Sequence, residues 1–139
     1  MDAIFLTARI LFAVIFLISA VGHLTKAAQM AQYADYKGAP GGKFGVIASG
    51  VTQGLGALMV LFGVYGDVGA LIVFATLIPI TFFMHAYWKE TDAQAKQNDQ
   101  ISFNKNLGLM GGALAFALLF AATSASLGLT ITEPLFQLT

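Results

Sequence analysis

The sequence contains no cysteine, and charged residues are scarce. Its 139 residues include 7 Lys or Arg and 7 Asp or Glu, so the formal net charge is zero. The absence of cysteine excludes a disulfide framework, an iron–sulfur cluster and a thiol relay carried by this chain. The balanced charge gives no indication of a nucleic-acid partner or an acidic substrate.

Hydrophobic residues make up 58% of the chain and charged residues only 10%, against roughly a quarter charged in soluble domains. Roughly 20 helical residues cross a hydrocarbon core of about 30 Å, and continuously apolar runs favour helices over barrel strands. We therefore predict an all-α integral membrane protein, with residues 1–139 forming one antiparallel bundle of four transmembrane helices. The predicted helices lie near residues 4–25, 44–65, 68–88 and 107–129.

The N-terminus carries Asp2 in place of the basic region of a signal peptide, so we expect the first helix to remain in the mature protein. The dipeptide Gly66-Asp67 makes the second and third spans an antiparallel hairpin. All six lysines lie in the other two connections, residues 26–43 and 89–106. The positive-inside rule places these two connections in the cytoplasm and both termini outside.

Both long connections show signs of short helices. In the first, Met30, Tyr33 and Ala34 repeat at helical spacing, which suits a helix lying in the membrane interface. In the second, Thr91 with Gln94 three residues later is typical of a capping box at the start of a short soluble helix.

Small residues recur at a spacing of four in two of the predicted spans. Gly50 and Gly54 form such a pair in the second span, and Gly108 and Gly112 form another in the fourth. Small residues allow two helix backbones to approach closely. The pattern therefore indicates either packing inside one four-helix bundle or the seam of a homodimer.

Two polar side chains fall inside the predicted spans. Arg9 is expected either to reach water along the first helix, to pair with Asp67 or Glu133, or to donate to an anion or a quinone carbonyl. Gln53 lies near the middle of the second span, where its amide is expected to form a hydrogen bond between helices or to contact a ligand.

The two histidines, His23 and His85, each precede the first lysine of a cytoplasmic connection and should lie at a similar depth. They suit hydrogen bonding at the interface, a polar contact to a quinone, or paired ligation of haem. If the first and third spans are neighbours, the histidines line one cleft, closed by Trp88 and by the segment around Tyr33 and Tyr36. We expect any ligand there to be a quinone or lipid, bound without metal.

Several stretches together resemble the DoxX family of small bacterial membrane proteins, and the resemblance extends over almost the whole chain. The shared features are an early arginine (Arg9), a Gly-Xaa-Pro close of the first loop (Gly38 and Pro40), and a His-Xaa-Xaa-Trp motif ending at Trp88. The stretches that carry the resemblance are "TARILFAVIFLISAVGHL", "MAQYADYKGAP", "GVTQGLGALMVLFG", "FFMHAYW" and "NKNLGLMGGAL". Many members have lysine where this chain has His23, so a role at that position does not transfer directly.

The resemblance implies a multi-pass protein of the bacterial inner membrane, and the distribution of lysines then places both termini in the periplasm. The family includes a subunit of thiosulfate:quinone oxidoreductase and a mycobacterial partner of oxidative-stress enzymes. This chain is accordingly expected to be an accessory subunit of a membrane redox complex, associated with the lipid bilayer and with other membrane subunits or itself. The alternative is a quinone-interacting oxidoreductase subunit. A small-solute transporter is less well supported, because we find no inverted repeat.

Overall fold

Helices form nearly the whole of the computed structural model, which describes residues 2–123 and 129–137. Four helical segments are long and apolar enough to cross a membrane, which confirms the predicted all-α membrane fold. In chain order the elements are α1 (Asp2–Thr25), α2 (Ala27–Tyr36), α3 (Gly42–Phe62), α4 (Gly66–Pro79), a π-helical turn η1 (Ile80–Met84), a 3₁₀ turn η2 (Tyr87–Lys89) and α5 (Ala93–Ala122).

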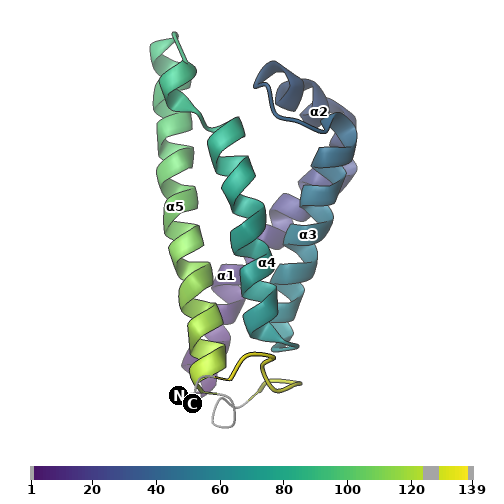
Figure 1. The fold of residues 1–139 in the computed structure, drawn as a ribbon, viewed down its shortest axis with the longest axis vertical. Coiled ribbons are helices and arrows are strands. Elements are labelled where there is room, and N and C mark those ends of the chain that lie inside the picture. Colours follow the sequence, from purple (N-terminus) through teal and green to yellow (C-terminus); the bar gives the residue numbers. More distant parts are fainter. Residues whose placement is uncertain (1, 124–128, 138–139) are drawn as a thin grey trace.

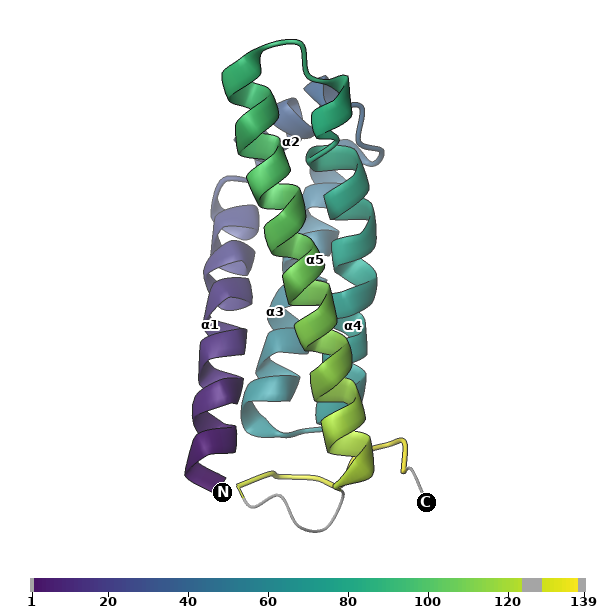
Figure 2. The same ribbon diagram turned by 90° about the vertical axis from the view of Figure 1, so that its left-hand side faces the viewer.

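The long helices form a bundle in which α1 packs on α3, α3 on α4, and α4 on α5 (Figures 1 and 2). The ring is closed by aromatic contacts between α1 and α5, where Phe5 and Phe12 meet Phe116 with ring centroids 6.0 and 4.9 Å apart. The start of α1, residues 129–137 and the α3–α4 turn lie at one end of the bundle. The short helix α2 and the connection before α5 lie at the other end, as the distribution of lysines predicts.

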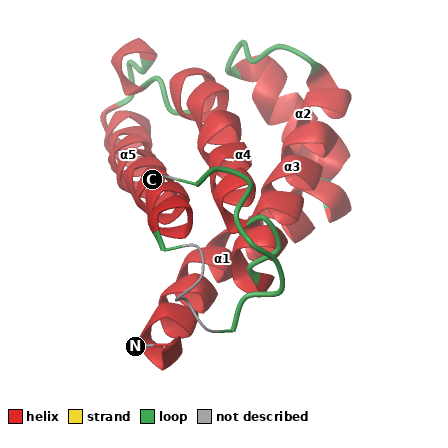
Figure 3. Cartoon of the chain, turned by 60° about the horizontal axis from the view of Figure 1, so that its bottom comes forward, coloured by secondary structure: helices red, strands yellow, loops and turns green. Residues whose placement is uncertain are grey.

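Helix α5 begins earlier and also ends earlier than the fourth span that the sequence predicts. The soluble helix expected after Thr91 and the fourth span are one continuous helix of 30 residues. Its N-cap is Asp92, whose carboxylate accepts a hydrogen bond from the Ala95 N–H at 2.8 Å. Helix α5 ends at Ala122 instead of residue 129, and part of the difference lies outside the described residues. Figure 3 shows the described residues 129–137 as a loop.

Glycines of α3 pack inside the bundle. A Cβ atom on Gly50 would lie 2.6 Å from the Cβ of His23 on α1, and a Cβ on Gly56 would lie 2.7 Å from the Gly69 carbonyl oxygen on α4. These glycines therefore let α3 approach both neighbours closely. On α5, by contrast, a Cβ on Gly108 would have no described atom within 4 Å. The small-residue pattern thus reflects packing within the bundle for α3.

Arg9 is buried and joins three parts of the chain. Its side chain is 1% exposed, so it does not extend to water. The guanidinium donates hydrogen bonds to the carbonyl oxygens of Val60 and Leu129, each at 2.9 Å, and to that of Leu61. The last carbonyls of a helix lack partners within the helix and carry partial negative charge. Arg9 therefore caps the C-terminal end of α3.

The ion pair considered for Arg9 is not formed. Within the described residues Arg9 makes no salt bridge to Asp67 or Glu133. Asp67 is also 1% exposed, and its Oδ2 instead accepts a hydrogen bond from the backbone N–H of Phe136 at 2.7 Å. This contact, with the Arg9 bond to Leu129, holds the C-terminal segment across the end of the bundle.

Candidate functional site

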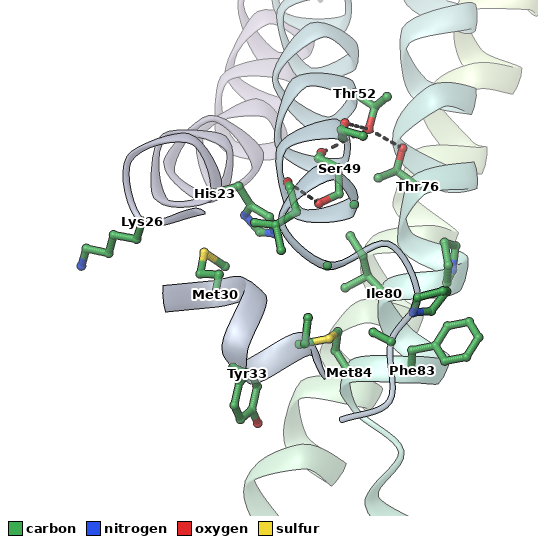
Figure 4. Close-up of a pocket in the computed structure, with 18 of the residues that line it drawn as sticks. His23, Lys26, Met30, Tyr33, Ser49, Thr52, Thr76, Ile80, Phe83 and Met84 are labelled. Atoms are coloured by element: carbon green, nitrogen blue, oxygen red, sulfur yellow. Dashed lines mark hydrogen bonds between the residues drawn. The ribbon is translucent and has the colours of Figure 1, made fainter. Parts of the chain in front are cut away.

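A groove of about 730 Å³ opens between α2, α3 and the α4–η1 segment (Figure 4). Helices α3 and α4 are in close contact where Gly56 meets Gly69. At their other ends, Pro79 is followed by the π-helical turn, a change of helix type that a proline favours because it lacks an N–H donor. Figure 1 shows the two helices apart at that end. Helix α2 forms the remaining wall.

The walls of the groove are mainly apolar, with a polar group at its inner side. Ser49 and Thr52 on α3 and Thr76 on α4 contribute hydroxyls, and the Thr76 hydroxyl donates to Thr52 Oγ1 at 3.1 Å. The other hydroxyl hydrogens are donated to helix carbonyls. Each oxygen nevertheless keeps acceptor capacity. The apolar lining comes chiefly from Met30, Ala34, Val46, Ile80, Phe83 and Met84.

His23 lies on the wall of the groove, with its ring fixed by α1. Its Nδ1 lies 2.8 Å from the carbonyl oxygen of Ser19. Because a carbonyl only accepts hydrogen bonds, Nδ1 carries the hydrogen and Nε2 remains for another partner. Neutral His23 therefore offers an acceptor at Nε2, and protonated His23 offers a donor there.

Only some of the residues predicted to line one cleft line the groove. Tyr33 lines the groove with His23, whereas Tyr36 does not line it and is 76% exposed, stacked on Tyr33 with ring centroids 6.4 Å apart. Trp88 lies outside the groove and packs edge-on against Phe103 of α5, at 5.6 Å between ring centroids. His85 is also outside it.

A smaller cavity of about 160 Å³, here called the inner chamber, brings the two histidines together. His23 lines both the groove and the inner chamber. His85 reaches the chamber from the end of η1, and its Nδ1 lies 3.4 Å from Asp99 Oδ1. Both histidines therefore line one cavity, although the closest neighbour of α1 is α3 and not α4.

Four further polar residues line the inner chamber: Ser19, Gln53, Lys105 and Asn106. Gln53 is 3% exposed and Asn106 is 5% exposed. Within the described chain, the Gln53 amide makes no hydrogen bond between helices, contrary to one of the two expectations for it. Asn106 was not selected from the sequence, because the charge of Lys105 led to a predicted fourth span that begins at residue 107.

A buried ion-pair cluster holds α2 against α5 beside these cavities. Lys37, which the sequence places in the first cytoplasmic connection, has a side chain only 8% exposed. It pairs with Glu90 and with Asp99, the latter at 2.5 Å. Burial opposes the charge, but the hydrogen bonds to the carboxylates of Asp99 and Glu90 outweigh burial and raise the pKa of Lys37. The wall that α2 contributes to the groove is thus tied to the bundle.

Among the described residues, no group of three or more His, Cys, Asp or Glu side chains is arranged to hold a metal ion. The geometry that is present consists of an amphipathic groove, a polar inner chamber and His23 between them.

Comparison with the curated proteins and with the solved structures gives no match. The family model described as DoxX matches residues 4–86, which is more than half of the chain. The match includes the buried Arg9, the whole of α2 and α3, and the histidine at the end of η1. Together with four helices of membrane-spanning length, this match shows that the chain is a small membrane protein belonging to the DoxX family.

Proposed function

We propose that the protein binds a quinone, or a lipid of similar shape, in the groove between α2, α3 and the α4–η1 segment. The observation that carries the proposal is the composition of the groove. It has a volume of about 730 Å³ and a mainly apolar lining, and its polar groups include His23, Thr52 and Thr76. Ligand pockets commonly combine apolar walls with a few placed polar groups.

The polar side of the groove suits a head group that carries oxygen. A quinone carbonyl accepts a hydrogen bond, which protonated His23 can donate from Nε2. A quinol hydroxyl donates one, which neutral His23 can accept at the same atom. The apolar tail would follow Ile80, Phe83 and Met84 toward the surrounding lipid. Lys26 and Gln29 at the groove add polar contacts near the interfacial helix α2.

Within this proposal the protein acts as one subunit of a membrane redox complex. The chain supplies the site for the head group, and a partner subunit supplies the electrons. Gentle solubilisation followed by identification of the co-purifying chains, the visible spectrum and the extractable quinone tests this part. Purification of the protein as a single species, with no bound quinone and no partner, would contradict it.

Ligand binding can be tested with decylubiquinone and the protein in lipid nanodiscs. Ala48 lines the groove, so Ala48→Phe should fill it and weaken binding about tenfold or more, since it removes apolar contact area from the ligand. Val51 is 51% exposed on the same helix and lies outside the groove, so Val51→Phe is the matched control. Equal affinities in the two variants, or no binding by the wild-type protein, would refute the proposed site.

A further inference from the structure

The inner chamber contains two buried amides that have no protein partner. Gln53 on α3 and Asn106 on α5 are at least nine-tenths buried, and both line the chamber. Within the described chain, neither side chain forms a hydrogen bond. Buried amides are very rarely left unpaired, because removing their polar atoms from water without a partner is costly. Their polar atoms are accessible from the chamber, so a hydrogen-bonding occupant there can satisfy them.

The hydrogen-bonding groups favour water as the occupant. Each amide presents both a donor and an acceptor, and each neutral histidine offers an acceptor. An anion satisfies only donors and a cation only acceptors, whereas water satisfies both. At about 30 Å³ per molecule in the liquid, the 160 Å³ of the chamber has room for a short chain of water molecules.

Both histidines line the chamber. His23 bonds the Ser19 carbonyl through Nδ1, and His85 bonds the Asp99 carboxylate through Nδ1. Each ring therefore keeps Nε2 for another partner. Of the two, only His23 also lines the groove.

We propose that the inner chamber holds a water chain that carries protons between the His85–Asp99 pair and His23, and thereby to a ligand oxygen in the groove. In the step at the groove, the Nε2–H bond of protonated His23 breaks as an O–H bond forms on the ligand. A chamber water then gives a proton to Nε2 of His23, and the water regains one as the Nε2–H bond of protonated His85 breaks. No electron moves in this step. The charged groups around the path are Lys105 at the chamber and Lys37 and Glu90 beside Asp99.

Transfer to a ligand rests on the proposed function, but the water path does not, so it can be tested without ligand. The chain has only two histidines, so the ¹⁵N-histidine spectrum contains two rings, which His85→Gln assigns. We expect both neutral rings to carry hydrogen on Nδ1. We also expect cross-peaks between water and both rings, and exchange of His23 protons with water.

Substitutions at Asn106 then test the path. Asn106→Leu should dry the chamber and slow His23 exchange about tenfold or more, as expected when a hydrogen-bonded relay step is lost. Asn106→Ala leaves room for more water and should preserve exchange. Asn104→Leu is the matched control, since Asn104 is exposed on the same helix and outside the chamber.

Equal exchange rates in Asn106→Leu and Asn104→Leu would overturn the proposal. So would equal slowing by Asn106→Leu and Asn106→Ala, which would indicate a packing effect, or a neutral His23 with its hydrogen on Nε2. Failure of decylubiquinone to bind the wild-type protein would instead end the proposed function and leave the water path standing.

Discussion

Gly56 offers a direct test of how the α3–α4 hairpin sets the shape of the bundle. An alanine Cβ there would lie 2.7 Å from the Gly69 carbonyl oxygen and 2.9 Å from Val73 Cγ2. A backbone oxygen cannot rotate away as a side chain can, so the two helices must separate or slide by a few tenths of an ångström. Overpacking of this kind typically costs about 1–3 kcal/mol.

Gly108 supplies the matched control. Gly108→Ala introduces the same methyl group where no described atom lies within 4 Å. Replacing glycine by alanine in a helix favours the helix by about 1 kcal/mol, and this gain is common to both variants. The difference between them should therefore report packing alone, with Gly56→Ala less stable than Gly108→Ala by about 1–3 kcal/mol.

The free energy of unfolding can be measured by titrating each variant in mixed detergent micelles with a denaturing detergent, followed by circular dichroism. Thermal unfolding in one detergent gives an independent ranking. Equal stabilities of the two variants within about 0.5 kcal/mol, the usual range for substitutions that touch nothing, would refute close contact between α3 and α4 at this level.

Two further predictions concern charge. Arg9→Met removes three hydrogen bonds and should lower the free energy of unfolding by about 2–4 kcal/mol, taking roughly 1 kcal/mol for each bond. Because Arg9 forms no ion pair with Glu133, the effects of Arg9→Met and Glu133→Gln should add in the double variant, and coupling above about 0.5 kcal/mol would argue for an ion pair. For topology, cysteines replacing the exposed Lys43 and Lys96 should react with a membrane-impermeant thiol reagent only after cells are opened, and labelling of intact cells would reverse the orientation. Lys37 is unsuitable for this test because it is buried.

The spans and the hairpin could be predicted because they depend on properties that add along the chain. Hydropathy and length identify four helices, and the Gly66-Asp67 turn is too short for any connection except an antiparallel one. The positions of charged residues did not predict the helix boundaries, because charged residues do not end a helix. Lys96 and Lys105 lie inside α5, whereas the rule used for the spans places them in a loop.

The contacts of the polar side chains could not be predicted, because their partners are distant in sequence or carry no sequence signal. Lys37 meets Asp99 across 62 positions, and counting charges treats both as solvated. Arg9 bonds backbone carbonyls, which every residue possesses. The position of His23 and His85 at a similar depth was readable from the lysines that follow them. That both histidines also line the inner chamber could not be predicted. The chamber is formed by residues of four helices, including Asn106 on α5.

The contacts of Arg9 also bear on the order in which the protein assembles during synthesis. Its acceptors on α3 lie 51 and 52 residues further along the chain, and the Leu129 carbonyl lies 120 residues further. None of them exists when α1 first enters the bilayer. Until α3 arrives, the guanidinium must stay near water or lipid head groups, where a charge is tolerated. The final depth of α1 is therefore reached only when α3 has inserted, and the N-terminal helix settles late although it is made first.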